Sequence, residues 1–383
     1  MAHCNTVLAQ LLKFIPRHDF EKLANQHHQG RAFRKSSRWD QFTALTLGQL
    51  SGRNGLRDIV DNIAVQSHRL YHLGCRKVSR SNLSRINEQK PYTLYEALFN
   101  QLLKRSQRVA PTHRFRFKNQ LYSLDASTID LCLSVFPWAD FRATKGAIKL
   151  HVGLNHQGYL PEFVTVTTGK DHDITVGRTL NFPKGSIIAV DKGYNDYSWY
   201  KQLTDKQIFF VTRLKTNAKY RVLKDHKVPS GKGIISDQTI QFTGAQTAKK
   251  CPLPMRRIHY HDAVTDKRYV FLTNNVKLAA RTIADIYKAR WQVELFFKWI
   301  KQHLKIKSFV GTSKNAVLTQ IWVALCVYLL LSLIKFQSKI SRSLYEILRI
   351  LQLNLFEKRD LIALLKGDLP DDRSDTQRQL ALL

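Results

Sequence analysis

The chain has 383 residues and a formal net charge of +32, with 61 lysines and arginines against 29 acidic residues. Its hydrophobic fraction of 44% excludes a disordered chain, and its length allows two or three domains. The charge predicts a polyanionic partner, with nucleic acid first, because displacing counterions from phosphates favours binding.

Cysteine usage and the N-terminus indicate an intracellular protein. The five cysteines form no C-x-x-C pair, and the first residues lack the pattern of a signal peptide. The apolar run at residues 321–334 is short for a membrane span, so we expect a buried core helix. We therefore expect a cytoplasmic, nucleoid-associated protein with reduced thiols and no membrane partner.

Residues 1–118 are predicted to be helical. Helical spacing is found at residues 39–50, 56–65 and 93–103, and Ser79 or Ser81 is placed to cap a further helix. Short helices with basic starts fit a DNA-binding unit of the helix-turn-helix type, or a helical cap with a solvated basic surface. The basic residues are Arg31, Arg34, Lys35 and Arg38 before the first of these helices, and Arg76, Lys77, Arg80 and Arg85 at the third.

From residue 119 the apolar pattern changes to a period of two, which is typical of strands. A mixed α/β fold is predicted, with a sheet flanked by helices over residues 119–214 and again over 276–340. The expected strands are 121–126, 148–154, 163–168, 186–191 and 208–214, and the expected helices between them are 174–180 and 196–203.

A polar block at residues 215–275 is predicted to be a β-rich insertion, with strands near 239–243, 257–261 and 268–273. Its lysines and arginines are available for phosphates. Helices then resume at about residue 279 and run to 305, followed by 315–336 and 343–355. Residues 341–383 are predicted to be a helical tail that is frayed from Pro370 onward.

One face of the predicted helix at 287–301 carries a single acid among polar and basic groups. Tyr287, Arg290, Glu294 and Lys301 fall within an arc of roughly 60°, with Lys298 beside them. Such a stripe suits a metal-binding carboxylate within a phosphate-binding surface. It is equally the composition of a solvated helix face with one Glu-to-Lys pair.

Two further carboxylates stand on separate predicted strands. Asp125 lies on the first strand and Asp191 ends a later one, so both could meet Glu294. Two-metal phosphodiester chemistry needs two or three such carboxylates, and oxygen ligands favour Mg²⁺, with Mn²⁺ as a substitute. Asp130, Asp171 and Asp173 are rival carboxylates on the same elements.

The spacing Tyr287-x₂-Arg290-x₃-Glu294-x₆-Lys301 resembles the Y-R-E-K signature of bacterial insertion-sequence transposases of the DDE type, in the insertion-sequence-four family. Leu-Asp-Ala-Ser-Thr around Asp125 and Val-Asp-Lys-Gly-Tyr around Asp191 are similar to the first two catalytic blocks of that family. Stretches such as Trp-Asp-Gln-Phe at residues 39–42 resemble members with an N-terminal helical DNA-binding domain. The resemblance spans roughly residues 18–340.

The resemblance implies an RNase H-like core with a β-rich insertion, and a metal-dependent DNA transposase. Asp125, Asp191 and Glu294 would bind two Mg²⁺ ions, while Tyr287, Arg290, Lys298 and Lys301 would hold DNA phosphates. It further implies cut-and-paste transposition through hairpin ends, with a homodimer pairing two inverted-repeat ends of double-stranded DNA before they join a target duplex. For the aromatic that traps a flipped base, Trp291, Trp299 and Tyr194 are candidates by residue type.

Two other functions fit the same sequence. The chain could be a domesticated or inactive relative that only binds DNA. It could also be a non-transposing nuclease without preference for particular ends. Cleavage of inverted-repeat duplexes compared with random duplexes distinguishes these possibilities from an active transposase.

Overall fold

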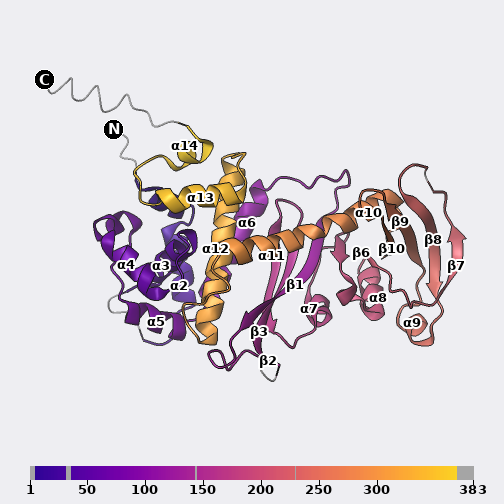
Figure 1. Ribbon diagram of the computed structural model, residues 1–383, viewed down its shortest axis with the longest axis horizontal. Coiled ribbons are helices and arrows are strands. Elements are labelled where there is room, and N and C mark those ends of the chain that lie inside the picture. Colours follow the sequence, from indigo (N-terminus) through magenta and orange to yellow (C-terminus); the bar gives the residue numbers. More distant parts are fainter. Residues whose placement is uncertain (1–4, 32–35, 143–144, 229, 369–383) are drawn as a thin grey trace. The chain divides into compact units, whose positions relative to one another are not determined.

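Residues 5–31, 36–142, 145–228 and 230–368 are described by the structure, which is a computed structural model. The chain divides into two units (Figure 1). The first unit joins residues 1–110 to residues 299–383, and the second unit comprises residues 111–298. Arg34, Lys35 and the tail from Pro370 lie outside the described residues.

The first unit is helical, as predicted. Hydroxyl caps set the starts of five of its helices, because the side chains of Thr6, Ser37, Ser79, Ser313 and Ser343 each accept a hydrogen bond from a first-turn backbone N–H. Its elements are α1 (Val7–Leu12), α2 (Arg17–Gln26), α3 (Arg38–Leu50), α4 (Leu56–Val65), η1 (Ser67–Leu73), α5 (Arg80–Gln89), α6 (Thr93–Val109), α12 (Lys314–Gln337), α13 (Leu344–Asn354) and α14 (Leu361–Lys366).

Helix α12 lies at the centre of this unit's core. Among the described helices it alone is long and apolar enough to cross a membrane, but its apolar segment is completely buried within the protein. It packs against α3, α5, α6 and α13. The predicted core helix is therefore confirmed, and its apolar surface is accounted for by packing against other helices.

The second unit is built on one mixed sheet. Its strands are β1 (Leu121–Leu131), β2 (Asp140–Arg142), β3 (Lys145–Asn155), β4 (Leu160–Thr168), β5 (Ile187–Val190), β6 (Phe209–Arg213), β7 (Tyr220–Asp225), β8 (Ile234–Phe242), β9 (Met255–Asp262) and β10 (Lys267–Thr273). The order is β2-β3-β1-β5-β6-β10-β9-β8-β7, and β4 also pairs with β3. Because β3 alone is reversed within β4-β3-β1-β5-β6, these five strands have the expected RNase H-like arrangement.

Helices cover both faces of this sheet. Val190 and its neighbours on one face pack against Trp199 and Leu203 of a helix that follows β5. On the other face, Ala189 packs with Ile283 of a helix that follows β10. Successive strand residues thus serve opposite cores, as the pleat requires. The helices of the unit are α7 (Asp173–Thr179), η2 (Lys192–Tyr194), α8 (Tyr197–Asp205), α9 (Ala245–Lys250), α10 (Ala280–Ala289) and α11 (Trp291–His303), whose last turn and a half lies beyond residue 298.

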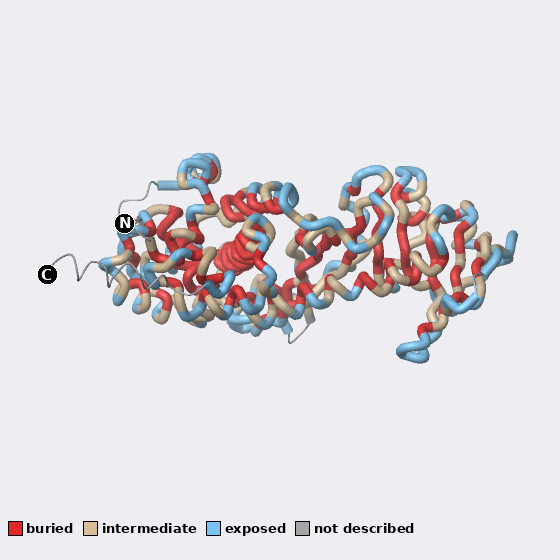
Figure 2. The backbone as a smooth tube through the Cα atoms, turned by 90° about the horizontal axis from the view of Figure 1, so that it is seen from above, coloured by how far each residue is buried: buried red, intermediate tan, exposed pale blue. Residues whose placement is uncertain are grey.

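The β-rich block at 215–275 contains the predicted strands, now seen as β8, β9 and β10, together with β7. Strand β10 pairs antiparallel with β6, so the block extends the sheet of the core. Its outer strand, β7, is mostly exposed, as the pale blue segment at the right-hand edge of Figure 2 shows. The block therefore belongs to the same sheet as β6, the strand that follows Asp191.

The single helix expected over residues 287–301 is in fact divided between two helices, α10 and α11. Arg290 separates α10 from α11, although its backbone stays right-handed helical, with φ −52° and ψ −33°. The N–H of Val293 donates to the carbonyl of Arg290, a tighter contact than in a regular α-helix. Helical spacing could not reveal this irregularity, because it leaves the direction of the chain nearly unchanged.

Acidification is expected to destabilise the second unit through His156. The ring is buried, with Nε2 lying 2.7 Å from the Ser123 hydroxyl on β1. Burial lowers the pKa of His156 to about 3, and His113 and Arg114 act in the same direction. Because the unfolded chain takes up a proton at about pH 6.5 and the folded chain does not, stability falls as the pH drops below that value.

We expect His156→Gln to remove about 2 kcal/mol of the loss in unfolding free energy between about pH 7 and pH 5. Glutamine can donate to the Ser123 hydroxyl or accept from it, but it does not titrate. Urea unfolding of the two proteins at both pH values gives the comparison. The same pH dependence in both proteins would show that His156 contributes nothing to it.

Candidate active site

Asp125, Asp191 and Glu294 come together in the second unit. Strands β1 and β5 are parallel neighbours in which Leu124 pairs with Val190, so the two aspartates follow at adjacent positions. Glu294 lies in the first turn of α11. The fold thus brings one carboxylate from each of three separate elements to one region.

The charges of the three carboxylates act on one another. Burial raises the pKa of Asp125 to about 6, opposed by the backbone N–H of Ala126 and by Arg290. The negative charges of Glu294 and Asp191 raise it further. Both other carboxylates therefore act on Asp125, which is the behaviour of acidic groups that share a site.

Arg290 lies between two of the carboxylates. Its Nη1 is 3.4 Å from Asp125 Oδ2, and its Nη2 donates to Glu294 Oε1 at 2.6 Å. The Arg290 side chain is 11% exposed. Desolvation lowers the pKa of Arg290, but the hydrogen bond to Glu294 and the surrounding negative charges outweigh it and raise the pKa overall. One cation therefore neutralises charge between Asp125 and Glu294.

Asp191 has a different environment. The hydroxyl of Tyr287 donates to its Oδ1 at 3.1 Å, and Nη2 of Arg213 donates to the same oxygen at 3.2 Å. Burial alone raises the pKa of Asp191, but the Lys192 N–H, the charge of Arg290 and these two side chains lower it overall. Asp191 is thus held in its ionised form.

The sequence analysis missed Arg213. It ends β6, which runs parallel to β5, so Arg213 stands beside Asp191 at the carboxyl ends of neighbouring strands. Its guanidinium also lies 5.7 Å from the centre of the Tyr287 ring. Arg213 could have been found from the sequence, because it lies near the end of the strand predicted at 208–214. If that strand is parallel to the one before it, both end at the same edge of the sheet, where Asp191 lies.

Lys298 is exposed on α11, four residues beyond Glu294. Lys301 follows three residues later and falls in the first unit. Their expected contacts with phosphates stay predictions.

The rival carboxylates do not pair with Arg290, although the charge of Asp173 acts on Tyr194 together with those of Asp125 and Asp191. Asp130 is exposed near the end of β1, and Asp171 accepts a hydrogen bond from the hydroxyl of Thr168 at 2.8 Å. Asp173 is paired with Lys149 at 3.1 Å. His172, another neighbour suggested by the sequence, is exposed at the start of α7. Arg290 therefore links Asp125 to Glu294 and to none of these rivals.

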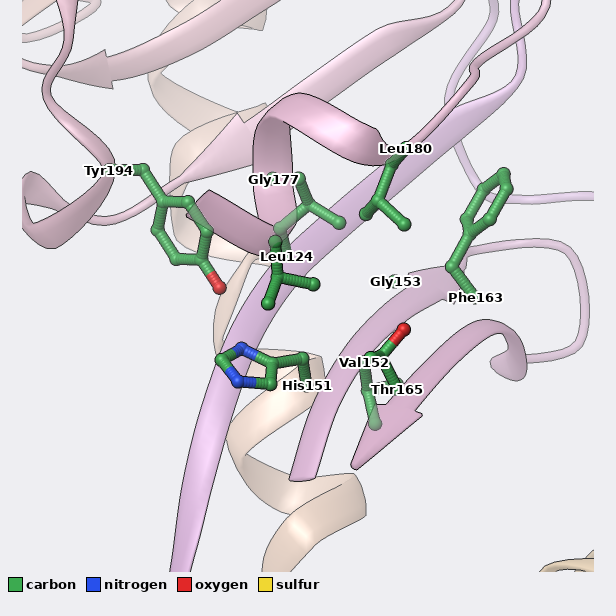
Figure 3. A pocket seen from close by; sticks show the side chains of 10 residues that line it. Leu124, His151, Val152, Gly153, Phe163, Thr165, Gly177, Leu180 and Tyr194 are labelled. Atoms are coloured by element: carbon green, nitrogen blue, oxygen red, sulfur yellow. The ribbon is translucent and has the colours of Figure 1, made fainter. Parts of the chain in front are cut away.

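Exposure separates the three aromatic candidates for base trapping. Tyr194 is only 3% exposed, and Figure 3 shows its ring turned into the protein, toward His151. The cavity there measures about 10 Å³, room for about one water molecule and far too small for a nucleotide base. Trp299 is half-buried and packs against Tyr328. Trp291, directly after Arg290, is 56% exposed and alone among the three presents its ring to solvent.

The donor set suits a divalent cation. Three carboxylates offer the oxygen ligands that Mg²⁺ and Mn²⁺ prefer, and two of them already hold a cationic group between them. Within the described ranges, no three His, Cys, Asp or Glu side chains stand at metal-ligand spacing. The guanidinium of Arg290 pairs with both Asp125 and Glu294.

Comparisons with known proteins give a consistent result. The family described as "Transposase DDE domain" matches residues 116–330, and a domain of unknown function (DUF4372) matches residues 3–76. The chain is 32% identical to a Sinorhizobium fredii protein whose name describes a transposase, over 74% of this chain and 79% of that protein. It is 29% identical to a Geobacillus stearothermophilus protein named as an insertion-sequence transposase, over 70% of each chain. A similarly named Synechocystis protein is 27% identical over 55% of this chain and 60% of its own length.

Proposed function

This chain belongs to the transposase DDE-domain family and is a DNA transposase of the insertion-sequence type, and from that premise we propose that Asp125, Asp191 and Glu294 form its catalytic centre. The observation that carries this assignment is geometric, since two residues of the Y-R-E-K signature are in contact with all three carboxylates. Arg290 and Tyr287, from the same signature, contact these carboxylates directly.

The proposed reaction uses two kinds of phosphoryl-transfer step, one with water and one with a 3′-hydroxyl as the nucleophile. A water molecule attacks the phosphodiester at the end of the element, forming one P–O bond as the bond to the 3′ oxygen breaks. The freed 3′-hydroxyl attacks the opposite strand in line, closing a hairpin as the bond between that phosphate and the flanking DNA breaks. A second water molecule opens the hairpin and frees the 3′-hydroxyl again, which then attacks the target duplex, with no covalent enzyme intermediate. The carboxylates serve both kinds of step from one position.

Divalent-metal dependence follows from the family, and the carboxylates are its proposed ligands. Asp125, Asp191 and Glu294 would hold Mg²⁺, with Mn²⁺ as a substitute and two ions as the expected number. Such ions, when bound, activate the attacking oxygen and stabilise the leaving oxygen. Arg213 and the Tyr287 hydroxyl keep Asp191 ionised and oriented for this role.

Tyr287, Arg290, Lys298 and Lys301 are proposed to hold the DNA backbone near the cleaved bond. Positive groups at a scissile phosphate offset the charge that accumulates in the transition state. Arg290 would serve in two ways, since it neutralises Asp125 and Glu294 in the free protein and has the forked geometry that suits a phosphate. Trp291, exposed next to it, is the proposed stacking partner for an unpaired base.

The proposed substrates are the terminal inverted repeats of the element and a target duplex. A net charge of +32 supports binding along extended duplex DNA. A homodimer would hold the two ends together, one at each active site.

The experiment that tests this function compares two duplexes in Mg²⁺. One carries the genomic DNA that flanks the gene and the other has a random sequence of equal length. Cleavage at the flanking repeats followed by joining to a plasmid supports a transposase. Equal cleavage of both duplexes would point to a nuclease without end specificity, and binding without cleavage would point to a relative that only binds DNA.

Replacing Arg290 is expected to make the protein more responsive to metal. Arg290→Gln removes the cation between Asp125 and Glu294, so without metal the unfolding free energy should fall by about 2 kcal/mol. Added Mn²⁺ should then raise the melting temperature more in the variant than in the original protein, because the guanidinium no longer competes. Thermal melting with and without Mn²⁺ measures both effects.

Arg281→Gln is the matched control for this prediction. Arg281 lies on α10 and pairs with Asp285 four residues later, as Arg290 pairs with Glu294, but far along the helix from the carboxylates. We expect its response to Mn²⁺ to equal that of the original protein. A response of Arg290→Gln no larger than that of the control would rule out the competition.

A further inference from the structure

Helix α5 presents a polar face to solvent. Arg80, Ser81, Ser84, Arg85 and Glu88 are all exposed, while Leu83 and Ile86 are buried on the opposite side. At 100° per residue the five exposed side chains share one face of the helix. With ten residues, α5 is about 15 Å long, which suits insertion of its face into a DNA major groove.

Hydrogen bonds on the buried side of α5 fix its position against α3 and α12. The side chain of Gln41 on α3 donates to Asn87 Oδ1 at 2.6 Å and accepts from the hydroxyl of Tyr95 at 2.9 Å. Asn315 of α12 donates to the carbonyls of Asn87 and Lys90. Buried polar networks of this kind fix orientation, so the exposed face is presented by a fixed element.

A groove of about 730 Å³ runs along this face. Arg57 at the start of α4 contributes to its lining, together with Arg80, Ser84, Arg85 and Glu88 of α5. Within the described residues, none of these three arginines takes part in an ion pair, although Arg85 donates to Asn82 Oδ1 at 3.1 Å. Helices α3, α4 and α5 contact one another, which is the packing of a three-helix DNA-binding unit.

We infer that α5 is the recognition helix of this transposase and reads base edges in the major groove of the terminal duplex. The inference rests on the proposed function, since that duplex is the end of the element. The face mixes donors and an acceptor: arginines match guanine, serines match several bases, and the Glu88 carboxylate accepts from cytosine. A surface that bound phosphates alone would have no use for an acid, which phosphates repel.

Arg57 is assigned a different task. It stands in the first turn of α4, where it lines the groove without belonging to the exposed face of α5. In helix-turn-helix units the preceding helix crosses the backbone, and a helix N-terminus favours an anion. Arg57 therefore holds a phosphate and carries no sequence information.

To test this, the full chain selects the duplexes that it binds from a pool with a randomised centre, in the absence of divalent metal. The affinity of the chain is then measured for the selected pool and for the unselected pool. Arg85→Ala and Ser84→Ala should each change the selected DNA sequence at one or two adjacent base pairs. Each should also weaken binding to the DNA sequence that the unmodified protein selects, by roughly ten- to a hundred-fold. Arg57→Ala should weaken binding to both pools alike and reduce its salt dependence.

Arg108→Ala is the matched control. Arg108 is exposed on α6, so this substitution removes the same charge at a position outside the groove. It should leave the selected sequence unchanged. An unaltered selected sequence in both α5 variants would overturn the inference, as would equal losses on selected and random DNA. Binding is measured without metal and without cleavage. The outcome therefore does not depend on whether Asp125, Asp191 and Glu294 prove to be catalytic.

Discussion

Asp125→Asn, Asp191→Asn and Glu294→Gln are each expected to slow Mg²⁺-dependent cleavage of the element's ends by roughly a thousand-fold or more, about 4 kcal/mol of transition-state stabilisation. Each change removes a negative oxygen and keeps the size of the side chain. Cleavage of an end duplex on a denaturing gel measures the rate, and a gel shift on the same duplex should show that binding survives.

Asp130→Asn is the matched control for these variants. Asp130 lies on the same strand as Asp125 but is exposed and does not contact Arg290. Its cleavage rate should stay within about two-fold of the original. A triad variant that cleaves as fast as this control would lose its assigned role, and the rival carboxylates would need to be tested in its place.

The second large effect concerns stability. Arg256→Met is expected to lower the unfolding free energy by about 3–5 kcal/mol, because it leaves the buried Asp237 carboxylate without its cation. Arg256 and Asp237 are 8% and 5% exposed at their side chains, and they form a two-pronged pair at 2.8 and 2.6 Å. Arg256 Nη1 also donates to the carbonyls of Asn275 and Leu278, just before α10 begins. Urea unfolding of the two proteins measures the difference.

The double variant Asp237→Leu, Arg256→Met is the control that isolates the unpaired charge. Since neither charge then stays buried alone, it should be more stable than Arg256→Met. A double variant as unstable as the single one would mean that the carbonyl contacts ahead of α10 matter more than the ion pair. In that case loss of Arg256 should also weaken catalysis, because α10 carries Tyr287.

Much of this structure could be predicted from local patterns. Apolar patterns located β1, β3, β4, β5 and β6, and a hydroxyl cap at Ser79 or Ser81 was expected where α5 begins. The apolar segment of α12 indicated a buried helix. The spacing of Tyr287, Arg290 and Glu294 indicated the family, because it needs only the order of residues along one helix.

Side-chain environments could not be predicted in the same way. Arg38 was expected in a basic surface cluster, yet it is buried, donates to the carbonyl of Pro91 and lies over the ring of Tyr95. Tyr194 was a candidate for base stacking, yet its ring is enclosed. Whether a cation or a ring meets DNA depends on what packs over it from elements distant in sequence, and a single sequence carries little of that information.

The sequence by itself determined the chemistry available to this transposase: three carboxylates, their basic companions and a large positive charge. Only the tertiary structure decided their partners. It placed Arg290 between Asp125 and Glu294, and Arg213 with Tyr287 on Asp191. It also left the polar face of α5 open. The reason is that local patterns follow from backbone periodicity, whereas charge pairing follows from which strands and helices become neighbours, and that is settled only when the whole core packs.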